Sequence, residues 1–305
     1  MSGRMTIAAH TDVGLREIFL DTPRGRIAGL RNDRSDRPPL LALHGWLDNA
    51  ASFVPLAPYL REFDLVALDL PGHGASAHRA PGYDYAFVDW IHDVLDAIDA
   101  LGWQHTHLLG HSMGAAIATL VAAAAPERVH RLALIEALGP LAGDAAQAGK
   151  KLREAVATRR SVATRSIQSG APTGKTRRII ADIEQAVAAR LAVGNMSKDA
   201  ARLIVARNLA PVAGGWVWRS DARLTLPTQL RITEDAACSI VRAVEAPTLL
   251  IVADPAPPYF TRELRDGRMA CLRDGRLLIV PGGHHLHMEQ PEVIAPLLRA
   301  FLDSQ

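Results

Sequence analysis

The sequence has 305 residues, of which 49% are hydrophobic and 22% are charged, and its formal net charge is +2. This composition fits one large α/β domain with an insertion. A net charge this small does not indicate nucleic-acid binding. Residues 1–12 lack the apolar core of a signal peptide, and no apolar run approaches the roughly 18 residues that span a bilayer. Cys238 and Cys271 have neither metal-ligand spacing nor a disulfide framework, so we expect a cytoplasmic protein without a membrane span.

Short apolar runs alternate with helical patterns, which predicts an α/β fold with a mostly parallel sheet and helices on both faces. In chain order, the expected strands are a hairpin at 16–20 and 26–30, then 40–44, 65–70, 107–111, 132–135, 248–252 and 277–280. A helix is predicted over 87–101, where apolar residues recur at helical spacing and aspartates lie largely on the other side. A second helix is predicted over 294–302.

Residues 139–245 interrupt this alternation. They are rich in Ala and Arg, favour helix, and carry 17 Lys and Arg against nine Asp and Glu. We expect an inserted helical cap over the carboxyl edge of the sheet, between two core segments at 1–138 and 246–305. Its positive charge indicates either a solvated helical face or a field that attracts acidic substrates, such as acyl thioesters that carry phosphate.

The most informative motif is Gly110-His111-Ser112-Met113-Gly114, which follows an apolar strand and opens an Ala-rich helix. A G-x-S-x-G sequence between a strand and a helix is typical of a nucleophile elbow, with the serine at the apex of a sharp turn. The two glycines allow a close approach that a Cβ atom would block. Ser112 is therefore the predicted nucleophile.

A serine hydroxyl needs a base to take its proton, and a base is expected after the last strand. Residues 281–291 contain three histidines, and His284 directly follows a glycine pair at the tip of the loop. We predict His284 as the base, with His285 as the next candidate. His284 and His287 also have a spacing found in metal sites, but no carboxylate or cysteine motif accompanies them, so no metal is expected.

The third member of such a site is a carboxylate that orients the histidine and stabilises its charged form. Asp254 ends the strand after the predicted cap, which gives the usual chain order of serine, acid and histidine. Glu136 ends the strand just before the cap and follows an almost continuous apolar run, so it is expected to point into the cleft. The sequence leaves both acids open.

The oxyanion of a tetrahedral intermediate needs backbone N–H donors. One is expected at Met113, directly after the nucleophile, and the other in the loop after strand 40–44, which reads His44-Gly45-Trp46. The N–H group of Trp46 is the predicted second donor.

Together these motifs resemble the α/β-hydrolase superfamily, and the loop residues 69–74 (Asp-Leu-Pro-Gly-His-Gly) add to the match. More narrowly, residues 44–50, Trp218-Arg219-Ser220-Asp221 and 284–288 look like the serine hydrolase-like subgroup. The resemblance implies a Ser-His-acid hydrolase with an eight-stranded sheet and a helical cap. One departure bears on the acid: where such proteins place a glycine and, later, the acid after the penultimate strand, this chain has Ala253 and Ala256.

From these residues we expect a serine hydrolase that cleaves a small-molecule carboxylic ester or thioester through an acyl-Ser112 intermediate, without a cofactor. The alternatives are C–C bond hydrolysis or acyl transfer on the same residues, and a non-catalytic ligand-binding protein of the same fold. Neither the natural substrate nor the oligomeric state follows from the sequence.

Overall fold

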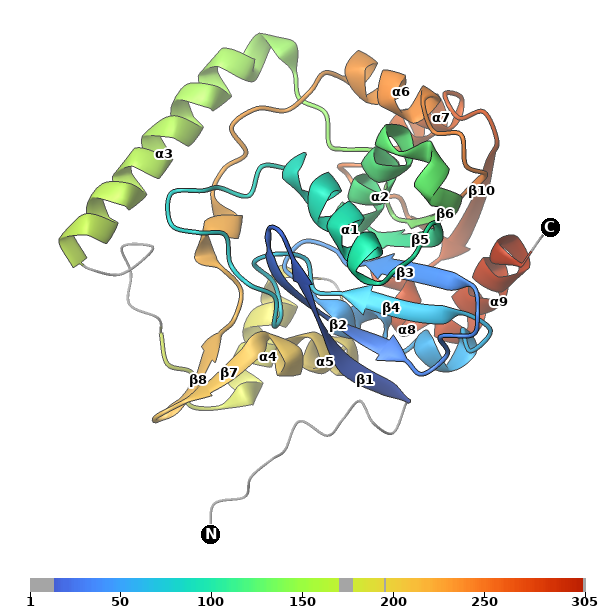
Figure 1. Ribbon diagram of the computed structural model, residues 1–305. Coiled ribbons are helices and arrows are strands. Elements are labelled where there is room, and N and C mark those ends of the chain that lie inside the picture. Colours follow the sequence, from blue (N-terminus) through green and yellow to red (C-terminus); the bar gives the residue numbers. More distant parts are fainter. Residues whose placement is uncertain (1–13, 170–177, 195, 304–305) are drawn as a thin grey trace.

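The computed structural model describes residues 14–169, 178–194 and 196–303 (Figure 1). Eight strands form one sheet in the order β1-β2-β4-β3-β5-β6-β9-β10. Their bounds are β1 (Leu15–Thr22), β2 (Gly25–Asn32), β3 (Pro39–Leu43), β4 (Asp64–Leu68), β5 (Thr106–His111), β6 (Val129–Ile135), β9 (Thr248–Asp254) and β10 (Gly275–Pro281). The β1–β2 and β2–β4 pairs are antiparallel and the other pairs are parallel. The prediction of a mostly parallel eight-stranded sheet is confirmed.

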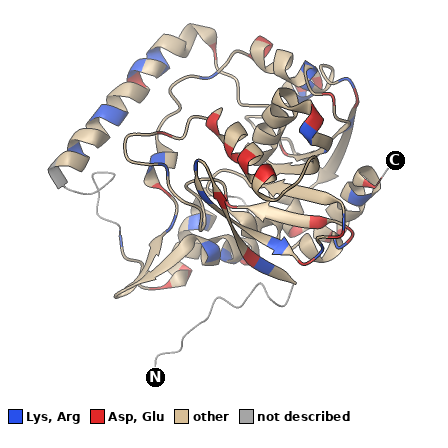
Figure 2. Ribbon diagram, viewed as in Figure 1, with Lys and Arg blue, Asp and Glu red and all other residues tan. Residues whose placement is uncertain are grey.

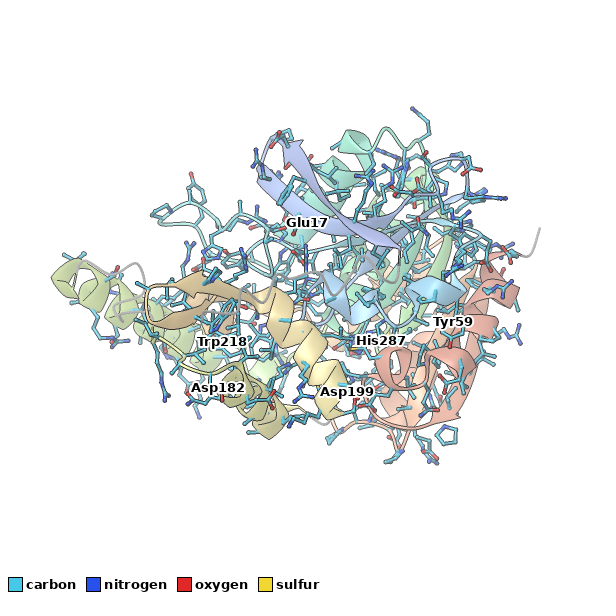
Figure 3. All side chains as sticks on the ribbon, turned by 90° about the horizontal axis from the view of Figure 1, so that it is seen from below. Glu17, Tyr59, Asp182, Asp199, Trp218 and His287 are labelled. Carbon is cyan, nitrogen blue, oxygen red and sulfur yellow. The ribbon has the colours of Figure 1, made fainter. Side chains whose placement is uncertain are left out.

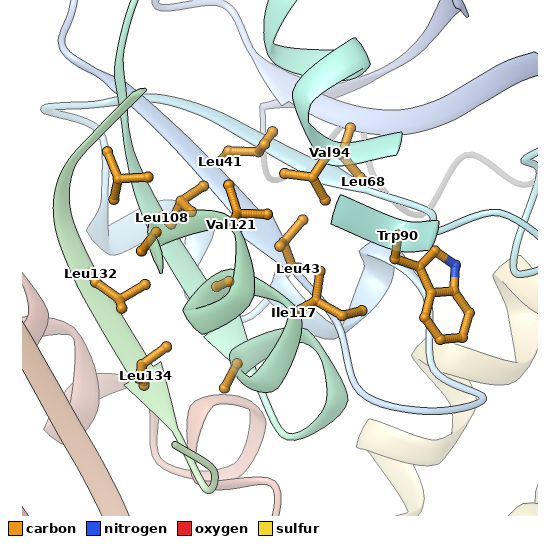
Figure 4. Packing of buried hydrophobic residues seen from close by; sticks show 14 of the residues in the cluster. Leu41, Leu43, Leu68, Trp90, Val94, Leu108, Ile117, Val121, Leu132 and Leu134 are labelled. Carbon is orange, nitrogen blue, oxygen red and sulfur yellow. The ribbon is translucent and has the colours of Figure 1, made fainter. Parts of the chain in front are cut away.

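The central strands are buried on both faces because successive side chains point to opposite sides of the sheet. Leu41 and Leu43 of β3 join an apolar cluster with helices α1 (Asp89–Ala100) and α2 (Met113–Ala124) (Figure 4). The neighbouring Leu40 and Ala42 join a second cluster, which includes α9 (Pro291–Leu302). Each fully buried leucine side chain contributes about 1.5–3 kcal/mol of hydrophobic free energy, so both helical layers are held firmly against the sheet.

Two further core helices complete these layers. On the side of α1 and α2 lies α7 (Arg262–Met269), and a short helix, α8 (Leu286–Glu289), precedes α9 on the other side. The helices predicted over 87–101 and 294–302 correspond to α1 and α9, with ends that differ by at most three residues. Their apolar stripes identified them because each buries one face against the sheet.

The segment predicted as a cap contains more than helices. It includes α3 (Ala148–Ser169), α4 (Ile183–Val193), α5 (Lys198–Asn208) and α6 (Glu234–Arg242), together with a hairpin of β7 (Leu209–Val212) and β8 (Gly215–Trp218) that we did not predict. Helices α4 and α5 share an apolar cluster with Met288 of α8. By contrast, Val241 of α6 joins the core cluster around α2. The limits 139 and 245 for a cap domain stay a prediction.

Helix α3 stands away from the sheet, and basic side chains follow much of its length (Figures 1 and 2). Arg159 ties it to the rest of the chain, since its guanidinium donates to Asp84 at 2.5 Å and to the carbonyl of Pro227 at 2.6 Å. Within the three described ranges, no helix combines the length and the apolar character needed to cross a membrane.

Some of the positive side chains in residues 139–245 form ion pairs with core acids, which the sequence did not suggest. Arg190 of α4 pairs with Asp48 at 2.5 Å, and Arg207 of α5 pairs with Asp69 at 2.8 Å and Glu17 at 3.1 Å. These acids belong to the core segment, and Asp48 and Asp69 are fully buried. Part of the charge therefore neutralises acidic core residues and fixes the inserted helices to the loops above the sheet.

Candidate active site

Ser112 sits at a strained turn between β5 and α2. Its φ angle is +52°, a left-handed value that L-residues other than glycine rarely adopt. Gly114 makes the turn possible, because a Cβ atom there would overlap the carbonyl oxygen of Leu43 at the end of β3. Such strain is retained where the surrounding structure holds it, and it directs the serine out of the sheet edge, as the elbow motif predicts.

His284 and Glu136 meet at this edge of the sheet. Nδ1 of His284, in the loop after β10, lies 3.0 Å from Oε2 of Glu136, which follows β6. The other carboxylate oxygen of Glu136 accepts from the N–H group of Ala253 at 2.5 Å, and the residue is fully buried. A carboxylate only accepts hydrogen bonds, so Nδ1 carries the proton and Nε2 keeps its lone pair for a substrate or nucleophile.

Asp254, the other candidate acid, does not make this contact. Its carboxylate accepts from Arg262 at 2.9 Å, and its side chain is 48% exposed. Strands β6 and β9 are neighbours in the sheet, so both acids end at the same edge, but only Glu136 turns its side chain inward to His284. The φ angle of Glu136 is +68°, and this unusual backbone gives the turn its direction.

Tyr259, which the sequence did not single out, also contacts the histidine. Its hydroxyl lies 2.9 Å from Nδ1 and 3.3 Å from Nε2 of His284. Burial, and to a lesser extent the Glu136 carboxylate, raises the pKa of this phenol, so it stays neutral at neutral pH, and its oxygen lies on the side of Nδ1–H as a second acceptor.

The predicted oxyanion donors lie on two segments that meet at the elbow. Met113 begins α2, and the first N–H groups of a helix have no partner within it. Trp46 lies in the loop after β3 and is 51% exposed as a residue, and its Nε1–H group donates to the carbonyl of Leu224 at 3.2 Å. Buried His44 donates from Nδ1 to the carbonyl of Gly45 at 2.7 Å, which shapes the turn before Trp46, and burial lowers its pKa.

A buried carboxylate links this loop to the elbow and to the histidine loop. Asp48 accepts from Arg190 at 2.5 Å and from Nε2 of His285 at 3.3 Å, and Nδ1 of His111 lies 3.8 Å away. Burial alone would raise the pKa of Asp48, but the His285 hydrogen bond and the charges of His285 and Arg190 hold it below its usual value. Asp48 is thus ionised and joins the residues next to Ser112 and His284 to helix α4.

His287 completes a group of histidines beneath the proposed base. Its ring centre lies 4.2 Å from that of His111, and its Nε2 contacts the hydroxyl of Ser52 at 3.3 Å. Figure 3 shows it between the yellow helices of the inserted segment and the red C-terminal helices. Burial lowers the pKa of both His111 and His287 well below the usual value, so both rings are neutral.

Comparison with known proteins identifies the family of the chain. The family described as alpha/beta hydrolase fold matches residues 38–291. The serine hydrolase-like protein of Danio rerio is 30% identical over 298 residues, which cover 95% of this chain and 89% of that protein. Serine hydrolase-like protein 2 of Homo sapiens is 29% identical and covers 94% of both chains.

A solved structure is similar over nearly the whole chain. The crystal structure of a hypothetical protein from Pseudomonas aeruginosa PAO1 has a TM-score of 0.84 and 41% identity, over 94% of this chain and 99% of that one. The resemblance to the serine hydrolase-like subgroup is confirmed, and it supports a hydrolase activity. The matched residues extend over most of the core and the inserted segment, so this chain belongs to the α/β-hydrolase fold family.

Proposed function

We propose that the protein is a serine hydrolase that cleaves a carboxylic ester or thioester through an acyl-Ser112 intermediate. The observation that carries the proposal is the 3.0 Å hydrogen bond between His284 and buried Glu136, with the ring centre of His284 4.8 Å from that of His111, the residue before Ser112. This bond fixes the histidine tautomer that a general base needs, with the lone pair on Nε2. The proposed triad is Ser112, His284 and Glu136, with Asp254 left outside it.

In the acylation step, Nε2 of His284 takes the Ser112 proton as Oγ attacks the substrate carbonyl carbon. The Glu136 carboxylate stabilises the imidazolium that forms. The N–H groups of Met113 and Trp46 receive the oxyanion, and each such donor is worth about 2.7–4 kcal/mol to the transition state. When the intermediate collapses, the His284 proton passes to the leaving alcohol or thiol.

Deacylation repeats these roles with water. His284 takes a proton from water, the hydroxide attacks the acyl carbon, and the proton returns to Oγ as the acid leaves. We propose that the exposed ring of Trp46 forms one wall of the substrate site. We further propose a cytoplasmic setting, because Cys238 and Cys271 are both free thiols.

Short p-nitrophenyl esters and a thioester analogue provide the test. Ser112→Ala is expected to lose at least about 10³-fold in kcat, because the covalent step is removed. Ser35→Ala, an exposed serine in the loop after β2, is the matched control and should keep full activity. A fluorophosphonate probe should label Ser112 alone.

The outcomes separate the competing functions. Unchanged turnover in pure Ser112→Ala protein contradicts the mechanism. Absence of both labelling and turnover favours a ligand-binding protein of this fold. Labelling of Ser112 with no ester or thioester turnover favours C–C bond hydrolysis or acyl transfer.

A further inference from the structure

Three buried side chains from distant parts of the sequence converge beneath the proposed active site. Asp48 lies in the loop after β3, His111 is the last residue of β5, and His285 lies in the loop after β10. One possible ligand atom from each lies within 4.8 Å of the others. Asp48 could not be paired with these histidines from the sequence, because it reaches them only through the order of the strands.

The hydrogen bonds of His111 show where its lone pair points. Nε2 of His111 lies 2.8 Å from the backbone carbonyl of His284, which can only accept, so Nε2 carries the proton. The lone pair is therefore on Nδ1, which faces a carboxylate oxygen of Asp48 at 3.8 Å. Within the described chain this buried Nδ1 has no hydrogen-bond partner. A lone pair that faces an anion is unfavourable unless a cation lies between them.

We propose that Asp48, His111 and His285 form a binding site for a divalent transition-metal ion of the zinc class. Two imidazole nitrogens and one carboxylate oxygen are a donor set that Zn²⁺, Co²⁺ and Ni²⁺ accept and that Ca²⁺ and Mg²⁺ do not favour. The two spacings to the Asp48 oxygen, 3.8 Å from His111 and 3.3 Å from His285, are close to the roughly 3.4 Å between ligand atoms on metal bonds of about 2.0–2.2 Å at a tetrahedral angle.

Gly45 keeps the space beside these atoms open. A Cβ atom at this position would lie 3.0 Å from Nδ1 of His111 and 3.1 Å from a carboxylate oxygen of Asp48. In the metal-free protein, Nε2 of His285 donates to Asp48 at 3.3 Å. On binding, the ion takes the place of that proton at Nε2, and the neutral ring carries its single proton on Nδ1, so no net charge is lost from the imidazole.

Arg190 competes with the ion for Asp48. Its guanidinium donates to the second carboxylate oxygen at 2.5 Å, and its side chain is 14% exposed against 2% for Asp48. Removal of this positive charge takes away one of the two side chains that donate to Asp48, and with it the repulsion between the guanidinium and the ion. The site is therefore expected to bind metal more tightly when Arg190 is neutral, which a surface histidine site would not do.

The test is a titration of the full chain, free of any affinity tag and of metal, with Co²⁺ followed by its visible absorption and by competition with Zn²⁺. We expect one ion per chain. His285→Gln and His111→Gln should each lose at least about 100-fold in affinity, because each removes a direct ligand. Arg190→Met should gain about tenfold or more.

His130→Gln is the matched control, because His105 and His130 form an exposed pair with ring centres 5.0 Å apart. It should leave the affinity within twofold. Absence of binding by the folded wild-type chain, loss of binding in His130→Gln, or unchanged affinity in folded His285→Gln overturns the proposal. If the His285 and His111 variants do not fold, the Arg190→Met titration decides, and an unchanged or weaker affinity there also overturns it.

Discussion

The substitution Glu136→Gln distinguishes the two candidate acids most sharply. The N–H group of Ala253 donates to one oxygen of Glu136, so a glutamine there must keep its own oxygen on that side. Its NH₂ group then faces Nδ1 of His284, which lies 3.0 Å from the other oxygen in the wild type. A donor at this position forces the histidine proton onto Nε2, where it blocks the uptake of the serine proton.

The expected cost follows from this wrong tautomer. A comparable change in a serine protease triad lowers kcat by about 10⁴-fold, or about 5.4 kcal/mol of transition-state free energy. We therefore expect Glu136→Gln to lose about 10³–10⁴-fold in kcat on p-nitrophenyl acetate. The thermal midpoint should change little, because the amide is nearly isosteric and keeps its bond to Ala253.

Asp254→Asn is the matched control. The Asp254–Arg262 pair is largely exposed, and such pairs contribute about 0–1 kcal/mol, so this variant should keep its activity within about threefold. If Asp254→Asn loses as much activity as Glu136→Gln, or if Glu136→Gln stays within tenfold of the wild type, the reasoning about the acid is refuted.

Three further predictions concern the scaffold. Gly114→Ala should abolish soluble expression or lower the thermal midpoint strongly, because its Cβ atom overlaps the carbonyl of Leu43; normal melting would contradict this close packing. Burial lowers the pKa of His73 to about 3 in the folded protein, against about 6.5 in the unfolded chain. Below pH 6.5 the unfolded chain therefore binds a proton at His73 that the folded protein does not, and the free energy of unfolding falls as the pH falls. Between pH 8 and pH 5 the loss in the free energy of unfolding amounts to about 2 kcal/mol. His73→Gln, measured by urea unfolding, should lose about 2 kcal/mol less over this pH range than the wild type; an equal loss in both proteins would refute the role of His73. Arg207→Met should cost about 3–5 kcal/mol in urea unfolding, because it leaves Asp69 buried with its charge unpaired, and a loss below 1 kcal/mol would show that Asp69 finds another partner.

The sheet could be predicted because its information is local. Strands such as β3 and β5 are short apolar runs, and a strand buried on both faces needs such a run. The hairpin of β7 and β8 escaped prediction because each strand has only four residues, and Pro211 and two glycines interrupt the pattern. Its antiparallel pairing, not its composition, defines it.

The site could be predicted in part. Ser112 and His284 carry strong local signals, since each follows a strand, Ser112 has a glycine two residues away on each side, and His284 directly follows two glycines. The choice between Glu136 and Asp254 could not be made, because both end neighbouring parallel strands and only the backbone turn at Glu136 decides which side chain points inward. Tyr259 gave no signal, because a single tyrosine in a proline-rich loop is not a motif.

The contacts of buried Asp48 were the part of the site that the sequence could predict least. Its partners are His285, more than 200 residues later, and Arg190, in the inserted helix α4. These two contacts depend on the order of the strands and on how the inserted helices pack against the loops. The excess positive charge of residues 139–245 was the one sequence feature related to these contacts, since arginines in that segment neutralise acids in the core.

Intact-protein and peptide mass spectrometry of the enzyme during turnover of p-nitrophenyl acetate tests the central claim most directly. The account predicts a transient mass gain of one acetyl group, located on the peptide that contains Ser112, and a burst of p-nitrophenol equal to the enzyme concentration. Ser112→Ala should show neither. Turnover with no acyl group on Ser112, or an acyl group on another residue that is competent for release, would contradict the account.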